Sequence, residues 1–143
     1  MDKALNLLGM MRRAHAIETG EDNSIDTVRA GKAKLVVCAA DIAENALRKL
    51  ENAVSGRSAM LIRLPYTKAE LSDAMGVPGG AVAAITDLGF ANALMKLLAE
   101  HDEQGYGEAA QEIAARLAKA DRRRRETRAQ KEKKTNGKRR TNI

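Results

Sequence analysis

The chain has 143 residues, of which 44% are apolar and 31% are charged, and its net charge at pH 7 is +6. This length allows one domain with its own core. A single cysteine excludes an internal disulfide framework, and no apolar run approaches the roughly 20 residues of a membrane helix. The N-terminal residues also lack the pattern of a secretory signal, so we expect a cytoplasmic protein.

The positive charge is concentrated near the C-terminus. Residues 121–143 contain 11 Lys and Arg and 3 Asp and Glu, a net +8, which leaves 14 cations and 16 anions, a net −2, for residues 1–120. A tail of this kind attracts a polyanion through phosphate neutralisation and counterion release. The alternative is a disordered, solubilising terminus. With only two Tyr, one Phe and no Trp, base stacking is not expected as a main binding mode.

Two helices and a short strand are expected first in the chain. An apolar stripe at helical spacing predicts a helix over residues 2–13. The stretch "AIETG" favours a short strand that ends at Gly20. A weaker helix is expected over 21–30, with Gly31 in the position of a helix C-terminal glycine.

A buried strand and a third helix follow. The run "LVVCAA", residues 35–40, is apolar without alternation, as expected for a strand covered on both faces. Asp41 and Glu44 have the spacing of a capping box, so they predict a helix start at Asp41. Gly56 is expected to end that helix.

The next part of the chain repeats the strand-helix alternation. It predicts, in order, a strand at "AMLIRL", a short helix opened by Thr67 and Glu70 and ended at Gly76, a "VPGG" turn, a strand at "AVAAI", and a helix over 88–100 capped by Asp87. This alternation indicates an α/β sandwich that contains parallel strand pairs, with helices on both faces of the sheet.

The expected domain organisation has four parts. Residues 1–100 form the globular domain, and the polar, glycine-containing residues 101–107 form a linker. A C-terminal helix over 108–121 has a thin apolar stripe, so it either docks weakly or acts as a spacer. Residues 122–143 are expected to be a flexible basic tail, helical at its start and frayed near Asn136.

Several short sequence segments, which occur in this chain in a fixed order, resemble one known family. "LLGMMRRA", "RAGKAKLV", "AMG" before a Pro-Gly turn, and "AVAAITDLGFA" are similar to the ribosomal protein family that binds kink-turn RNA, which includes large-subunit proteins seven-Ae and thirty-e. The match is best with the bacterial YlxQ-type branch and covers roughly residues 2–100. The resemblance implies a three-layer α-β-α sandwich with a mixed four-stranded sheet, in which "AIETG" supplies the fourth strand.

The resemblance also implies an RNA-contacting motif at the start of the second helix. RNA-binding members have the pattern G-x-N-E-x-x-K there. In this chain Gly20 matches, Asp22 stands at the asparagine position, Asn23 at the glutamate position and Asp26 at the lysine position. A helix N-terminus attracts an anionic backbone. Two carboxylates facing phosphate would instead repel it, so this departure weakens the expected kink-turn recognition.

A second contact region is implied at the loop before the last strand. Its glycines allow backbone N–H groups to approach sugar or phosphate, although a plain turn is the simpler interpretation. Cations that flank the second helix are expected at the same end of the molecule, or else as solvated surface charges. The expected RNA-binding residues of the globular domain are Arg12, Arg13, Gly20, Glu21, Asp22, Asn23, Asp26, Arg29, Lys32, Gly76, Val77, Pro78, Gly79 and Gly80, with His15 and Lys34 nearby.

The basic tail is expected to add phosphate contacts without sequence preference, while the globular domain reads RNA shape. The expected tail contacts are Arg122, Arg123, Arg124, Arg125, Arg128, Lys131, Lys133, Lys134, Lys138, Arg139 and Arg140.

No catalytic or metal-binding pattern stands out. Cys38 falls in an expected buried strand, and His15 and His101 are far apart in sequence. We therefore expect a non-enzymatic, monomeric protein without cofactor, metal or membrane. Its expected partner is RNA, ribosomal RNA first, with the ribosome or translation factors as further candidates. The alternatives are a protein-interaction module and an RNA-substrate-binding accessory of an RNA-modifying enzyme.

Overall fold

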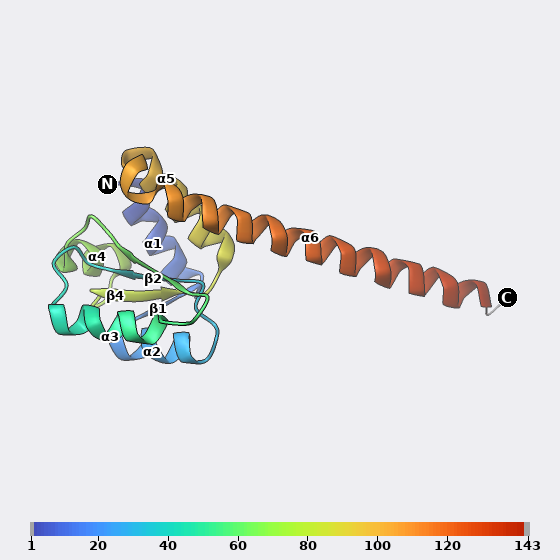
Figure 1. The fold of residues 1–143 in the computed structure, drawn as a ribbon, viewed down its shortest axis with the longest axis horizontal. Coiled ribbons are helices and arrows are strands. Elements are labelled where there is room, and N and C mark those ends of the chain that lie inside the picture. The colour runs from blue at the N-terminus through green and yellow to red at the C-terminus, as the bar shows by residue number, and fades with distance from the viewer. Residues whose placement is uncertain (1, 142–143) are drawn as a thin grey trace.

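The computed structural model describes the backbone of residues 2–141 and side chains as far as residue 132. Helices and strands alternate through most of the chain (Figure 1). The elements are α1 (Lys3–Arg13), β1 (Ile17–Thr19), α2 (Glu21–Arg29), β2 (Leu35–Cys38), α3 (Glu44–Val54), β3 (Met60–Arg63), α4 (Lys68–Met75), β4 (Val82–Ile85), α5 (Leu88–His101) and α6 (Glu103–Thr141).

The four strands form one mixed sheet in the order β1-β4-β2-β3. β2 runs parallel to β3, and β4 runs antiparallel to both β1 and β2. The two central strands are buried along their whole length. The mixed four-stranded sheet expected from the family resemblance is therefore confirmed, with β1 as the fourth strand.

The sheet separates two apolar cores. Because side chains alternate along a strand, Leu35 and Val37 of β2 pack into one core, and Val36 and Cys38 pack into the other. Helices α1, α4 and α5 cover the first face, and α2 and α3 cover the second (Figure 1). This arrangement confirms the expected three-layer α-β-α sandwich.

The long helix α6 docks on this sandwich. Ile113 is completely buried in the core beneath α5. The Tyr106 hydroxyl donates a hydrogen bond to the Arg63 carbonyl oxygen at 2.8 Å, and the Arg116 guanidinium donates to the Ser58 carbonyl oxygen. Ser58 precedes β3 and Arg63 ends it, so these two bonds attach α6 to the chain at both ends of an edge strand of the sheet.

The start of α6 differs from the expected linker. The helix begins at Glu103 rather than near Glu108, and only Asp102 separates it from α5. Asp102 Oδ1 accepts a hydrogen bond from the Gly105 N–H at 3.0 Å, so an aspartate cap opens the helix where the glycines suggested a loop. The helix also continues past the expected fraying point at Asn136, to Thr141. The expected division of the chain into domain, linker and flexible tail stays a prediction.

The expected capping box at Asp41 is wrong. Helix α3 begins at Glu44, and the preceding Ala43 offers no side-chain cap. Asp41 Oδ1 accepts instead from the Lys68 N–H at 2.8 Å, which ties the loop after β2 to the first turn of α4. The capping box of Thr67 and Glu70 at the start of α4 is confirmed.

Two further helix ends agree with expectation. Asp87 Oδ1 accepts from the Phe90 N–H at 2.9 Å and caps α5. Gly76 adopts the left-handed conformation directly after α4, with φ 68°. Among the described helices, none combines the length and the apolarity needed to cross a bilayer.

Candidate nucleic-acid interface

Helix α2 begins with a glycine that no other residue could easily replace. Gly20 has φ 100°, a conformation that L-residues rarely adopt, and its N–H donates to the Val82 carbonyl oxygen at 2.9 Å. This bond holds the start of α2 against the start of β4. No side chain caps the helix here, so its first N–H groups and the positive end of its dipole are open to an anion.

The side chains that follow Gly20 have different orientations. The Asn23 side-chain amide donates back to the Thr19 carbonyl oxygen at 3.0 Å, which leaves its oxygen as an acceptor. Asp22 and Asp26 are exposed. Glu21 Oε1 lies 3.7 Å from Lys49 Nζ, which connects the start of α2 to α3. The first turns of α2 therefore offer open backbone donors beside exposed carboxylates.

The loop at residues 76–80 has a shape set by its glycines. Gly79 has φ 72°. Gly80 donates its N–H to Ser72 Oγ at 3.0 Å, and a Cβ added at Gly80 would lie 3.1 Å from the backbone of Ser72. The loop is therefore packed against α4 at its end, while Pro78 and Gly79 remain exposed.

The structure brings the start of α2 and this loop together. A depression of about 250 Å³ is lined by Glu21 and Gly79 together with Ala43 and Lys68. The two contact regions implied by the family resemblance thus lie beside one another, at the end of the sheet where the central strand β4 begins. Lys68 was not expected there, because its position depends on its long-range bond with Asp41.

The cations predicted to lie at this end lie elsewhere. β1 pairs with β4 so that Ile17 is opposite Ile85, which places the end of α1, with Arg12 and Arg13, near the far end of β4. The Lys34 N–H donates to the Ile85 carbonyl oxygen at 2.7 Å, so the turn after α2 lies there too. Arg29 and Lys32, with His15 and Lys34, belong to that far end. The prediction that Arg12, Arg13, His15, Lys32 and Lys34 fringe the glycine loop is therefore wrong, while RNA contact by any of them or by Arg29 stays a prediction.

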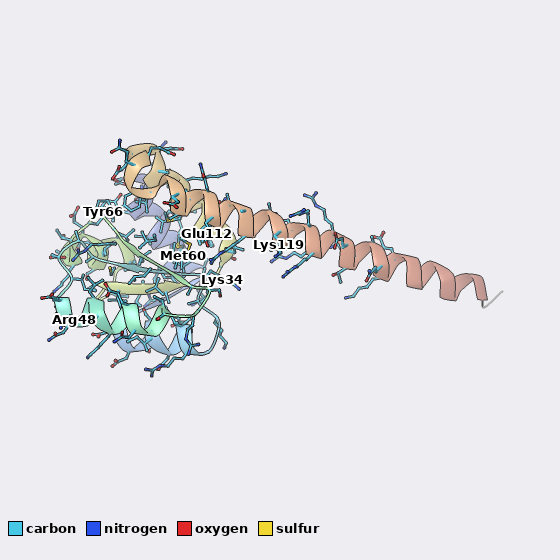
Figure 2. All side chains as sticks on the ribbon, in the orientation of Figure 1. Lys34, Arg48, Met60, Tyr66, Glu112 and Lys119 are labelled. Atoms are coloured by element: carbon cyan, nitrogen blue, oxygen red, sulfur yellow. The ribbon has the colours of Figure 1, made fainter. Side chains whose placement is uncertain are left out.

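The cations of the tail lie on α6. Beyond the docked part of this helix, charged side chains project from several sides of it (Figure 2). The predicted tail contacts whose side chains are described are all exposed: Arg122, Arg123, Arg124, Arg125, Arg128 and Lys131. The predicted contacts that lie outside the described side chains are Lys133, Lys134, Lys138, Arg139 and Arg140.

Cys38, His15 and His101 lie on different elements of the fold. Burial raises the pKa of the Cys38 thiol; Arg63 lowers this pKa by less and Glu51 raises it slightly, so the thiol stays protonated at neutral pH. His15 follows α1 and His101 ends α5. The described residues contain no group of three His, Cys, Asp or Glu side chains placed to hold a metal.

Comparisons with known proteins agree with this geometry, although no model of a protein family matches the chain. It is 35% identical over 96 residues to the RNA-binding protein YlxQ of Bacillus subtilis, covering 64% of this chain and 91% of that protein. The protein of the same name from Enterococcus faecium is also 35% identical over 96 residues, covering 67% of this chain and 91% of the relative.

Solved structures show the same similarity. A Bacillus halodurans protein of unknown function matches with a TM-score of 0.63 and 27% identity, over 68% of this chain and 97% of that one. A Giardia lamblia 15.5 kD RNA-binding protein matches with a TM-score of 0.54 and 26% identity, over 67% of this chain and 82% of that one.

Fold and site together define an α-β-α sandwich with a glycine-opened helix beside a glycine loop, and with these comparisons they define the class of kink-turn-family proteins. Within that class, the chain belongs to the YlxQ-type branch of the family of large-subunit proteins seven-Ae and thirty-e.

Proposed function

We propose that this protein binds structured RNA without catalysing a reaction. The observation that supports this most is the adjacency of the open N-terminus of α2 and the 76–80 loop at one edge of the sheet. Free backbone donors at a helix start suit phosphate oxygens, and exposed glycines let the loop backbone approach a sugar or phosphate. Relatives that share this fold are named RNA-binding proteins.

The contact made by the domain alone is expected to be weak. Asp22 and Asp26 are exposed on α2, at the positions where the family motif has an asparagine and a lysine. Their repulsion of phosphate offsets part of the attraction of the helix dipole. Asn23 keeps an acceptor oxygen for a base edge, so recognition of a kink-turn-like shape remains the proposed mode.

In this proposal, the cations of α6 supply the attraction to phosphate that the domain alone lacks. Residues 121–143 carry a net +8, against −2 for residues 1–120. Each phosphate neutralised on RNA releases counterions and adds about 0.7–0.9 to the slope of log K against log salt. The tail therefore adds affinity that depends on salt and not on sequence. We propose ribosomal or kink-turn-like RNA in the cytoplasm as the target, bound by a monomer, with the ribosome or translation factors as further candidates.

An electrophoretic mobility-shift series tests this function. The RNAs are a consensus kink-turn hairpin, a ribosomal RNA fragment and an unstructured strand, each at two salt concentrations. The variant replaces Arg122, Arg123, Arg124 and Arg125 with glutamine, and its matched control replaces the same four residues with lysine. We expect the glutamine variant to bind all three RNAs more weakly and with a lower salt slope, because four cations are lost, while the lysine control keeps the wild-type slope.

The preference for structured RNA separates the domain from the tail. We expect the glutamine variant to keep a preference for the folded RNAs, since the 76–80 loop and α2 are unchanged. Failure of the intact chain to bind any of the three RNAs at low salt would exclude the proposed function. Loss of all preference in the variant would show that the tail alone binds RNA.

A second candidate function is supported by the acidic surface of α2. Asp22 and Asp26 are four residues apart, so they share an exposed face that could bind a basic polypeptide. Tight binding of a Lys-rich peptide, lost in an Asp22→Asn and Asp26→Asn double variant that still fails to bind RNA, would favour this protein-interaction role.

A further inference from the structure

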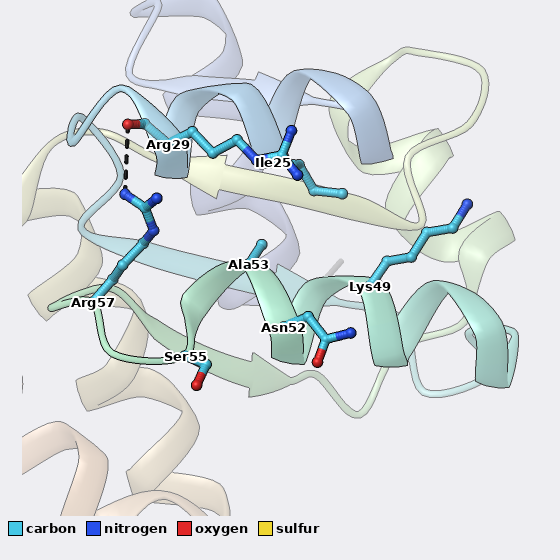
Figure 3. A pocket seen from close by; sticks show the side chains of 7 residues that line it. All are labelled: Ile25, Arg29, Lys49, Asn52, Ala53, Ser55 and Arg57. Carbon is cyan, nitrogen blue, oxygen red and sulfur yellow. Dashed lines mark hydrogen bonds between the residues drawn. The ribbon is translucent and has the colours of Figure 1, made fainter.

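A groove with a cationic lining runs between α2 and α3. Its volume is about 490 Å³, and Ile25 of α2 and Ala53 of α3 supply its apolar surface (Figure 3). It lies on the face of the sheet that α2 and α3 cover, and no residue of the 76–80 loop lines it. We call this feature the α2–α3 groove. None of the residues that line it carries a carboxylate.

Three cations from three parts of the chain line the α2–α3 groove. They are Arg29 at the end of α2, Lys49 in α3, and Arg57 in the turn that follows α3 (Figure 3). In the described part of the chain, Arg29 forms no ion pair. The pair between Lys49 and Glu21 is 3.7 Å long and exposed on the lysine side, so it holds Lys49 only weakly.

Arg57 is held in place by the end of α2. Its Nη1 donates to the carbonyl oxygens of Val28 and Arg29, at 3.4 and 3.5 Å. These carbonyls belong to the negative end of the α2 dipole, where a cation is favourable. The contact fixes one end of the guanidinium, so this cation is positioned at the rim before any ligand arrives.

The remaining lining residues suit a phosphodiester. Asn52 and Ser55 line the groove and carry an amide and a hydroxyl that can donate to phosphate oxygens. Guanidinium groups bind phosphate through two parallel N–H donors, and the apolar stems of Arg29 and Lys49 can lie along Ile25 and Ala53. A concave, cationic, donor-rich lining without carboxylates is complementary to an RNA backbone.

We propose that the α2–α3 groove binds phosphates of the RNA backbone, as a contact separate from the start of α2. This inference rests on the proposed RNA-binding function. The groove would also let α2 contribute to RNA binding despite the carboxylates of Asp22 and Asp26. These exposed carboxylates occupy the motif positions, while Arg29 and its neighbours form a separate cationic surface beside Ile25. The RNA backbone follows the groove, and the motif positions at the start of α2 contribute less to the affinity.

A pair of full-length double variants tests the groove. Arg29→Gln with Lys49→Gln removes two groove cations and leaves the structural contact of Arg57 intact. The matched control, Arg48→Gln with Lys96→Gln, removes one arginine and one lysine from exposed sites outside the groove. Binding of a kink-turn hairpin is measured by fluorescence anisotropy from 50 to 300 mM KCl, and thermal unfolding is recorded for each variant. We expect the groove variant to lose about 1.4–1.8 from the salt slope, which is twice the value for one phosphate contact, and the control to keep the wild-type slope.

Each outcome separates the groove from the broader function. If the wild type binds the hairpin and both double variants retain its slope, the groove inference is wrong and RNA binding stands. If the wild type binds no RNA, the proposed function fails first. If the groove variant instead loses binding of a Glu-rich peptide with its RNA slope unchanged, the groove serves an acidic polypeptide and the inference is again wrong.

Amide chemical shifts supply a readout that does not depend on a variant. On titration of the ¹⁵N-labelled full chain with the hairpin, we expect shifts at Asn52, Ser55 and Arg57 in the groove. The amides of Lys96 and Glu100 on α5 serve as internal references. Shifts confined to residues outside the groove would overturn the inference.

Discussion

Gly9 shows how one hydrogen atom in place of a methyl group decides a helix contact. It lies inside α1, where alanine would ordinarily stabilise a helix by about 0.5–1 kcal/mol. A Cβ at this position would lie 2.8 Å from the carbonyl oxygen of Ala74 in α4. That oxygen belongs to the backbone and cannot rotate away, so the glycine permits the close approach of two helices.

We therefore predict that Gly9→Ala destabilises the protein. The clash forces α1 and α4 apart, and we expect a loss of about 1–3 kcal/mol in the free energy of unfolding, measured by urea denaturation. The control is Asn6→Ala, an exposed position on the same helix, which should gain a few tenths of a kcal/mol. A stabilised Gly9→Ala variant would show that the helices do not approach this closely.

Asp2 links the stability of α1 to pH. Its Oδ1 accepts from the Ala4 N–H at 2.7 Å and caps the helix. Burial raises the pKa of this carboxyl, but a side-chain hydrogen bond from Tyr66 and backbone N–H bonds from Ala4 and Leu5 lower it more, so its pKa lies below the usual 3.8. A lowered pKa means that the stabilisation is complete above pH 3.8 and is lost as pH falls through the folded-state value.

We predict that Asp2→Ala costs about 1 kcal/mol of unfolding free energy at pH 7. The difference from the wild type should shrink as the pH falls below about 4, because the wild-type carboxyl then becomes protonated. The matched control is Asp2→Asn, which retains a capping oxygen but cannot titrate, so its contribution should not change with pH. Urea denaturation at pH 7, 5, 4 and 3 measures these differences, and parallel wild-type and Asp2→Ala profiles would contradict the role of the charge.

Helix α6 is part of the folded body at the scale of elements. Ile113 is completely buried against α5, whereas Leu117, one turn later, is only partly covered. We predict that Ile113→Ala lowers the free energy of unfolding by about 2–5 kcal/mol, as expected for a core cavity, and that Leu117→Ala has a smaller effect. The measurement is urea denaturation followed by circular dichroism. An unchanged midpoint for Ile113→Ala would mean that α6 is only loosely attached.

Most elements could be predicted from the sequence because their signals are local. The box of Thr67 and Glu70 and the cap at Asp87 each lie within four residues of the helix they open. The start of α3 could not be predicted, because Asp41 bonds to Lys68, 27 residues away. The start of α6 was missed although Asp102 and Gly105 carried a capping signal, since the neighbouring glycines were interpreted as a loop.

The candidate site was predictable only in part, for a related reason. Gly20 and the 76–80 loop were predicted as RNA contacts from the family resemblance, and this role stays a prediction. The bond of Gly20 to Val82 holds the start of α2 beside the start of β4. The α2–α3 groove had no sequence signal. Arg57 reaches the end of α2 across 28 residues of chain, and only the packing of α2 on α3 brings those cations together.

At the scale of the whole molecule, charge is divided between two parts. Residues 1–120 carry a net −2, and the strongly cationic end of α6 extends away from the sandwich (Figure 1). A helix rises about 1.5 Å per residue, so Lys131 lies about 27 Å along the axis from the buried Ile113. The most distant described cation therefore lies well outside the body, and RNA that contacts both parts must span that separation.

The arrangement of arginines around α6 has one more consequence. Successive residues of a helix are rotated by about 100°, so Arg122, Arg123, Arg124 and Arg125 encircle the axis instead of forming a stripe. This part of α6 therefore presents positive charge to a polyanion on every side of the helix. Under the proposed function, these arginines can contact an RNA strand on any side of α6 but cannot set its direction, so the direction would be set by the sandwich.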